Sequence, residues 1–144
     1  VVSLKDITLF NQYEKGISMD ENTNRRRAGL LSDLYICGSN ALTRNGELVN
    51  ADGSGNRVAA QIFGPKKVLI VAGKNKIVDT IEDGFKRIHD IAIPKNIERM
   101  NNTAIAMGKE PRYNINNIGN KFAYIDGDEA ARTTIIIVDE ALGF

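Results

Sequence analysis

Three short apolar runs dominate the hydropathy pattern of the chain. They comprise residues 34–37, 68–72 and 135–138, and none of them alternates with polar residues. A strand of this kind needs cover on both faces, and such strands are typical of parallel sheets in α/β proteins. We therefore expect strands that begin at Leu34, Val68 and Thr134 to share one mixed, mainly parallel sheet.

Helical signals lie before and between these runs. Ser18, followed three residues later by Glu21, forms a capping-box pattern and predicts a helix over about 19–31. Apolar positions at helical spacing predict a second helix over about 80–91, and Pro94 is expected to open a further turn or helix. Helices that alternate with buried strands indicate an open α/β sheet with helices on both faces.

Turn signals mark the remaining connections. Asn45 and Gly46 stand between two short apolar segments, and this dipeptide predicts a tight hairpin in which both residues have positive φ. The asparagine-rich stretch 101–120 predicts a long polar excursion rather than a core element. Residues 122–125 are expected to form a strand, and a turn at 126–129 then leads into the last apolar run.

Composition narrows the class of protein. Nineteen basic residues face eighteen acidic residues, so no long-range field favours nucleic acid or an anionic membrane. Cys37 is the only cysteine, which excludes an internal disulfide and predicts a reducing, cytoplasmic location. We interpret residues 1–144 as one domain. Because the chain begins at Val1 rather than at methionine, we expect its N-terminus to be incomplete.

A glycine-rich loop carries the strongest chemical signal. It consists of Asn50, Ala51, Asp52, Gly53, Ser54, Gly55, Asn56 and Arg57. Gly53 and Gly55 permit backbone N–H groups to converge. Asn56 is expected to cap a following helix, whose N-terminus adds partial positive charge, so a phosphate or carboxylate fits this loop. Arg57 would supply a charged fork to the same anion. The alternative is an ordinary loop in which Asp52 and Asn56 satisfy only the turn and the cap.

Polar residues follow two of the predicted strands. Lys74 and Lys76 come after the run that begins at Val68, and Asn40 follows the run that begins at Leu34. Ligands of open α/β sheets gather at the carboxyl ends of strands, so these residues and the glycine-rich loop are expected to meet in one crevice. A solvated loop is the alternative for the two lysines. The candidate ligand-binding residues are Asn40, Asn50, Asp52, Gly53, Gly55, Asn56, Arg57, Gly73, Lys74, Asn75 and Lys76.

Candidates for catalysis are few. Asp52 is the only acid inside the glycine-rich loop, and Glu140 is the next candidate. Isomerisation requires such a base within reach of a substrate proton. His89 has no second histidine or cysteine nearby in the sequence, and Cys37 is expected to pack within its strand. We therefore expect no metal site in this chain.

Five segments form one dense, ordered pattern. They are residues 39–43 (SNALT), 45–50 (NGELVN), 52–60 (DGSGNRVAA), 63–68 (FGPKKV) and 73–78 (GKNKIV). This pattern resembles the lactate-utilisation (LUD) domain family. The resemblance covers about half the chain, from the helix before Asp33 to roughly Arg99, and residues 136–144 are similar to the end of the family.

The resemblance implies a fold akin to the sugar-phosphate isomerase and CoA-transferase superfamily. It also implies a role in oxidising L-lactate to pyruvate beside iron–sulfur or flavin partner proteins. Related short proteins carry a cysteine cluster after the position of Arg99, whereas residues 100–120 hold no cysteine, so we expect no cofactor in this chain. We also expect part of the family's N-terminal lobe, with its glycine-rich strand end, to be missing.

Two functions remain open. In the first, the domain is an accessory component of a lactate-oxidising system and binds a small organic or phosphorylated anion without doing chemistry. In the second, it is an enzyme of sugar-phosphate isomerase or CoA/acyl-transfer type. The scarcity of bases and nucleophiles favours the first. Neither function involves nucleic acid or a membrane, and a homo-oligomer is compatible with both.

Overall fold

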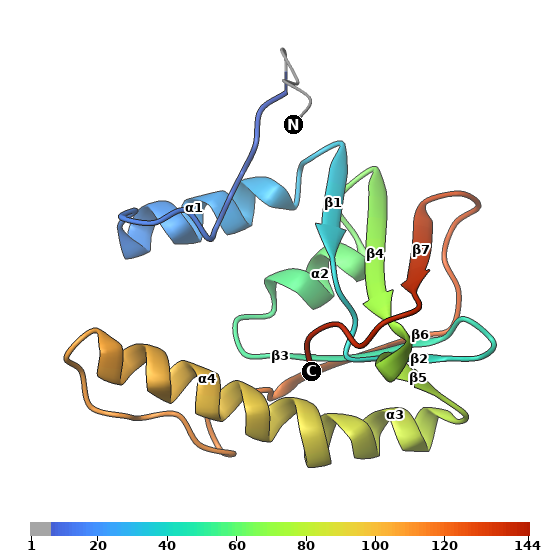
Figure 1. Cartoon of the computed structure of the whole chain (residues 1–144). Coiled ribbons are helices and arrows are strands. Elements are labelled where there is room, and N and C mark those ends of the chain that lie inside the picture. The colour runs from blue at the N-terminus through green and yellow to red at the C-terminus, as the bar shows by residue number, and fades with distance from the viewer. Residues whose placement is uncertain (1–6) are drawn as a thin grey trace.

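The computed structural model describes residues 7–144 and shows two sheets packed with helices (Figure 1). The first sheet has the order β1-β4-β7 and is parallel throughout. Its strands are β1 (Leu34–Cys37), β4 (Lys67–Gly73) and β7 (Thr133–Val138). Val68 pairs with Tyr35 on one side and with Thr133 on the other. The prediction that the three apolar runs share one sheet is confirmed. The expectation of an incomplete N-terminus concerns Val1, which lies outside the described residues.

The second sheet has the order β5-β2-β3-β6. Its strands are β2 (Ala41–Thr43), β3 (Leu48–Asp52), β5 (Ile77–Val78) and β6 (Lys121–Ile125). The predicted hairpin and the predicted strand at 122–125 are confirmed. The turn itself differs, because only Gly46 has positive φ, at 97°, and Asn45 does not. Thr43 N donates to Glu47 O and Gly46 N donates to Thr43 O, so the connection is a three-residue loop with glycine in its left-handed position.

Helix α1 (Met19–Gly29) begins as the capping box predicts. Ser18 Oγ accepts a hydrogen bond from Glu21 N at 3.1 Å, which satisfies one of the free N–H groups of the first turn. Helix α2 (Asn56–Ile62) follows the glycine-rich loop and leads into β4. The α1 and α2 helices lie on the side of the parallel sheet that carries Tyr35 and Cys37, since Gly29 of α1 approaches the Tyr35 ring and Gln61 of α2 reaches the Cys37 sulfur.

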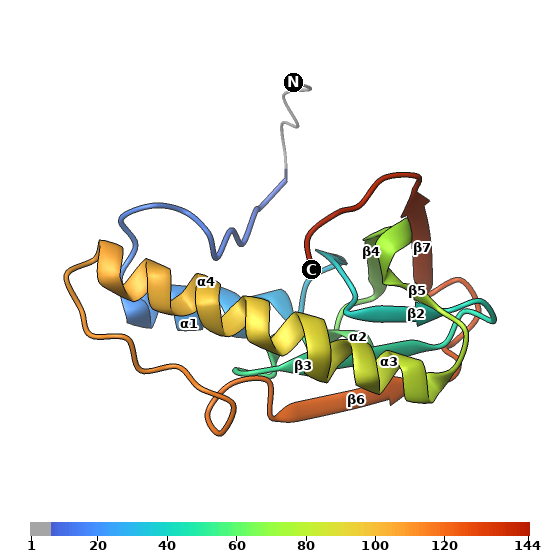
Figure 2. The same cartoon turned by 60° about the horizontal axis from the view of Figure 1, so that its bottom comes forward.

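A long helical segment crosses the second sheet (Figure 2). It comprises α3 (Ile81–Arg87), a π-helical turn labelled η2 (Ile88–Ala92) and α4 (Ile93–Ala106), which follow without interruption. Pro94 lies in the first turn of α4, as predicted. The prediction of a polar excursion is wrong for residues 101–106, which continue the helix. Asparagine at 101 does not end the helix here, because its side chain is used by the returning loop: its Oδ1 accepts from the backbone N–H groups of Arg112 and Tyr113.

The core lies where the long helical segment meets the second sheet. One buried cluster includes Val49, Ile88 and Ile93, and a second joins the two sheets through Leu48 and Ile70. Gly84 lets α3 approach β3 closely, because a Cβ at this position would lie 2.8 Å from Val49 Cγ2. A glycine that weakens the helix locally therefore serves the packing of the helix on the sheet.

The parallel sheet is covered less completely than its apolar runs predict. Leu34, Ile36 and Ile136 are 51%, 63% and 46% exposed, so the expectation of cover on both faces is wrong for β1 and β7 within residues 7–144. Burial alternates along β1, because α1 and α2 cover only the Tyr35 side. The class itself, a mainly parallel α/β sheet flanked by helices, is confirmed.

Candidate functional site

The glycine-rich loop is closed by its own carboxylate. Asp52 Oδ2 accepts hydrogen bonds from the backbone N–H groups of Arg57 and Val58, each at 3.0 Å. Asp52 therefore caps α2 and occupies the position at the helix terminus that a bound anion would need. The prediction that Asn56 is the N-cap is wrong. Asn56 is the first helical residue, and Gly55, with φ of 92°, is the N-cap.

The guanidinium of Arg57 forms hydrogen bonds within the protein through all three of its nitrogens. Its Nε and Nη2 donate to Asp52 Oδ1 at 3.0 and 2.8 Å, and Nη2 also donates to Asn40 Oδ1 at 2.6 Å. Its Nη1 donates to Gly38 O and to Asn50 Oδ1, at 3.1 and 2.8 Å. The expectation that this guanidinium offers an open fork to a ligand is wrong, because all three nitrogens already bind strand ends and the Asp52 carboxylate.

The neighbouring asparagines complete this arginine cluster. Asn50 is fully buried, and its Oδ1 accepts from Ser39 Oγ, Asn40 N and Arg57 Nη1, while its Nδ2 has no partner among residues 7–144. Asn40 Oδ1 accepts from Ala51 N at 3.0 Å. The ends of β1 and β3 and the start of β2 are thus joined in one polar network. The predicted meeting of Asn40 with the glycine-rich loop is confirmed.

The two loop glycines, Gly53 and Gly55, contact Lys121 of β6. A Cβ at Gly55 would lie 2.8 Å from Lys121 Cδ, and Lys121 Nζ donates to Gly53 O at 2.7 Å. Asn56 Nδ2 donates to the Tyr35 hydroxyl at 3.3 Å. These contacts tie the loop to β6 and β1.

Arg87 is the main site residue that sequence reasoning missed. It is buried, its Nε donates to Asn75 O at 2.9 Å, and its Nη1 donates to Asn40 O at 2.6 Å. Its Nη2 forms no hydrogen bond with the described residues. Arg87 therefore bridges the loop after β4 to the start of β2 while keeping one donor free. No local signal separates it from the neighbouring exposed Lys86, because the contact depends on how α3 packs.

Lys76 is the second buried cation at this edge. Lys76 is only 5% exposed, and its Nζ forms no ion pair or hydrogen bond within the described chain. Burial, reinforced by the positive charges of Arg87, Arg57 and Lys95, lowers the pKa of Lys76 to about 8. We call Lys76 and Arg87, together with Asn40 and Asn75, the Lys76 cluster.

The other residues of the predicted set brace the C-terminal segment. Asn75 Oδ1 accepts from Leu142 N, and Asn75 Nδ2 donates to Gly143 O, both at 3.1 Å. A Cβ at Gly73 would lie 2.4 Å from Leu142 N, so only glycine allows this close approach. The segment then passes beside the Lys76 amine, because a Cβ at Gly143 would lie 3.9 Å from Lys76 Nζ.

Lys74 and Glu140 point elsewhere. Lys74 Nζ pairs with Asp139 at 2.9 Å, and both side chains are exposed. Glu140 is also exposed, and its backbone oxygen accepts from Lys74 N at 3.1 Å. Of the two predicted catalytic candidates, Asp52 is thus engaged with Arg57 and α2, and Glu140 contacts the loop after β4 through its main chain.

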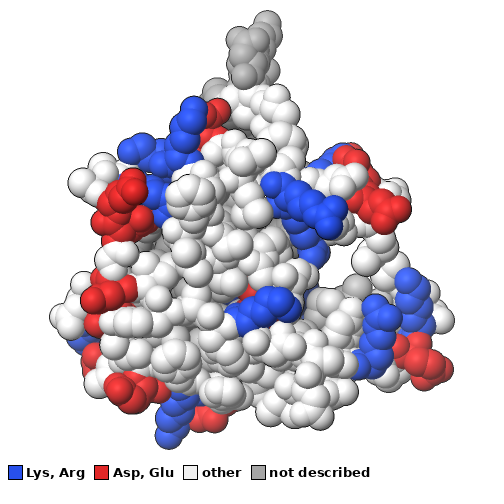
Figure 3. Space-filling view, turned by 180° about the vertical axis from the view of Figure 1, so that it is seen from behind, with Lys and Arg blue, Asp and Glu red and all other residues white. Residues whose placement is uncertain are grey.

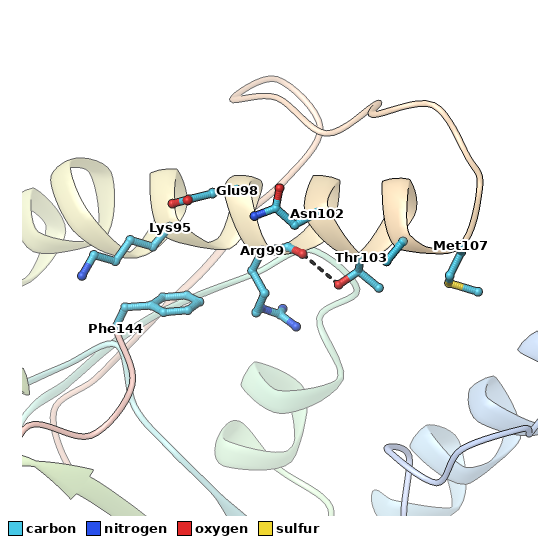
Figure 4. A pocket seen from close by; sticks show the side chains of 8 residues that line it. Lys95, Glu98, Arg99, Asn102, Thr103, Met107 and Phe144 are labelled. Carbon is cyan, nitrogen blue, oxygen red and sulfur yellow. Dashed lines mark hydrogen bonds between the residues drawn. The ribbon is translucent and has the colours of Figure 1, made fainter.

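A groove of about 730 Å³ lies between α4 and the last residue of the chain (Figure 4). Its wall includes Lys95, Arg99 and Thr103 of α4, and Phe144 lies opposite them. Phe144 follows Gly143, whose added Cβ would lie 3.9 Å from Lys76 Nζ, so the C-terminal segment connects the groove to the Lys76 amine. From behind the molecule, by contrast, charges of both signs are dispersed around a largely uncharged surface (Figure 3).

The comparisons identify the family. The model of the LUD domain matches residues 2–138, nearly the whole chain, so the chain belongs to the LUD domain family. No curated protein and no solved structure matches it. None of the described helices has the length and apolar character needed to cross a bilayer. Within residues 7–144, no three His, Cys, Asp or Glu side chains are grouped as a metal site would require.

Proposed function

We propose that this LUD-domain protein binds a small organic anion at the Lys76 cluster, as an accessory component in the oxidation of L-lactate to pyruvate. The observation that carries the proposal is Lys76, a residue only 5% exposed whose amine has no acidic partner in the described chain. The groove at Phe144, next to the C-terminal segment that passes this amine, would provide the ligand's entrance. In this role the protein would work beside iron–sulfur or flavin partner proteins in the cytoplasm.

The charge balance supports an anion. Asp52 offsets the charge of Arg57, but Arg87 donates only to backbone carbonyls, which carry no net charge. Lys76 adds a second uncompensated cation, and its pKa of about 8 leaves most molecules protonated at pH 7. Buried charges without partners are unfavourable, so a ligand carboxylate or phosphate that supplied the missing charge would be stabilised.

The donors favour a small ligand. Among residues 7–144, Arg87 Nη2 and Lys76 Nζ have no hydrogen-bond partner, and they belong to residues that are almost completely buried. Each can donate a hydrogen bond to a carboxylate. Lactate and pyruvate have this group and agree with the association of the family. The alternative, an isomerase or acyl-transfer enzyme, is less well supported because Asp52 is engaged and the Glu140 side chain is exposed.

Thermal unfolding with a panel of anions tests the proposal. Lactate, pyruvate, a sugar phosphate and CoA would be added to the wild type, to Lys76→Met and to Lys74→Met. A ligand at a hundredfold excess over its Kd stabilises the wild type by about 2.7 kcal/mol. We expect the gain to be lost in Lys76→Met and kept in Lys74→Met, whose lysine is exposed and paired with Asp139. Equal shifts in the two variants, or no shift with any anion, would overturn the proposal.

A further inference from the structure

We propose that Lys76 holds 2-oxo carboxylates covalently, through an imine between its Nζ and the ligand's carbonyl carbon. This inference rests on the proposed function, because the ligand must first be bound as an anion at the Lys76 cluster. It adds a reversible bond that distinguishes a 2-oxo acid from the corresponding 2-hydroxy acid.

Lys76 differs from the other described lysines in burial, and from several of them also in partners. Lys66 and Lys74 pair with aspartates, and Lys67 and Lys121 donate to backbone oxygens. All four are exposed. Lys76 is the buried lysine of residues 7–144, and its amine is without a partner there. An amine with no hydrogen bond to break is free to attack a carbonyl group.

The electrostatic surroundings keep part of this amine neutral. Only the neutral form is a nucleophile, and an ordinary lysine is almost fully protonated at pH 7. Burial and the charges of Arg87, Arg57 and Lys95 lower the pKa of Lys76 to about 8. At pH 7 about one molecule in ten would then carry the neutral amine, compared with roughly one in several thousand for an exposed lysine.

Arg87 provides the complementary contact. Two of its nitrogens are held by Asn75 O and Asn40 O, which fixes the guanidinium, and Nη2 has no partner among residues 7–144. In a 2-oxo acid the carbonyl carbon is one bond away from the carboxylate, and Arg87 is held at Asn75 O, the residue that precedes Lys76. The proposal therefore places that carbon at the Lys76 amine. A 2-hydroxy acid binds through the same carboxylate but offers no carbonyl carbon, so it stays non-covalent.

The bond-forming step balances without a redox partner. The neutral Nζ adds to the carbonyl carbon, a C–N bond forms, and the former carbonyl oxygen takes up a proton. Loss of that hydroxyl group as water then leaves a C=N bond. The amine and the ketone have become an imine and one water molecule, and water reverses the reaction. The protonated imine keeps a positive charge beside the ligand carboxylate.

Borohydride trapping tests this chemistry. The protein would be incubated with pyruvate and with lactate at pH 7, reduced with borohydride, and analysed by intact mass and peptide mapping. We expect one reduced pyruvyl group on the peptide that contains Lys76, and about tenfold or more labelling there than at any exposed lysine. Its yield should rise with pH through about 8, as the amine loses its proton. Lactate should give no adduct.

Two matched variants and one parallel measurement make the result decisive. Lys76→Arg keeps the charge but has no primary amine, so its adduct should vanish, whereas Lys74→Arg should be labelled like the wild type. Peptide mapping of the wild type alone locates the adduct even if Lys76→Arg folds poorly. Labelling spread over the exposed lysines, or no adduct, would overturn the imine. If lactate and pyruvate still raised the melting temperature, the proposed anion site would stand, and if neither did, both proposals would fail.

Discussion

Two arginines meet at the same strand ends in this protein, and their surroundings are opposite. Arg57 binds the Asp52 carboxylate and four further oxygen atoms of the fold, so its charge and its donors are fully used. Arg87 binds two neutral carbonyls, one of them that of Asn75 directly before Lys76, whose amine has no partner in the described part of the chain. The first arrangement builds the framework, and the second leaves charge available for a ligand. A basic residue indicates a binding site only when its own chain does not neutralise it.

The largest expected effect comes from removing the carboxylate that pairs with Arg57. Asp52→Asn should lower the free energy of unfolding by about 3 kcal/mol, because it leaves Arg57 without a counter-charge and weakens the cap of α2. Urea unfolding measures the change. Asp79→Asn is the control, since Asp79 pairs with Arg44 on the surface and its loss should cost less than about 1 kcal/mol. Similar losses in both variants would contradict a framework role for Asp52.

A smaller effect should follow from replacing Gly73 by alanine, in the strand end that precedes the Lys76 cluster. A Cβ there would lie 2.4 Å from Leu142 N and 2.5 Å from Glu140 O, so Gly73→Ala must displace the C-terminal segment. We expect about 2 kcal/mol of destabilisation, together with weaker anion binding. Gly127→Ala serves as control, because no atom lies within 4 Å of its added Cβ. Unchanged anion binding in Gly73→Ala would show that the segment does not shape the site.

The smallest effect concerns the pH dependence of stability. The folded pKa of Lys76 is about 8 and the ordinary value is 10.5, so between these values the unfolded chain binds more protons. The free energy of unfolding should therefore rise with pH across this window, by about 1–2 kcal/mol from Lys76. Lys76→Met should lack this rise and be more stable than the wild type at pH 7 without ligand. If the free energy of unfolding of both proteins depended on pH in the same way, the pKa of Lys76 would not be lowered in the folded state.

Local patterns predicted the parts of the fold that depend on local physics. Ser18 caps α1 by accepting a hydrogen bond from Glu21 N, three residues later. The apolar run that begins at Val68 pairs in the sheet with the other two apolar runs, as expected. Cover on both faces was predicted for the same reason and proved wrong, because an apolar run does not reveal which helices reach it. Leu34 and Ile36 are exposed on the face opposite α1 and α2.

The placement of the candidate site residues was predicted in part for similar reasons. The glycine-rich loop and Asn40 do meet, since strand ends of one sheet share an edge. Sequence could not show that Asp52 would turn back onto Arg57, because the same residues suit an open loop. Nor could it show that Arg87 would be buried, since that depends on the contact of α3 with β2 and β3.

The π-turn at Ile88–Ala92 also marks a place where the length of the chain can change. Such a turn holds one more residue than an α-helix needs, and it does so by widening, so each of its residues turns the chain by less than the α-helical value of about 100°. Deleting one residue between 88 and 92 would therefore restore regular pitch while α4 kept nearly the same orientation relative to α3. Lys95 and Arg99 would stay in the wall of the groove, and Arg87 would stay in place. The helical segment thus tolerates a change of one residue in length at this turn without separating the groove from Arg87.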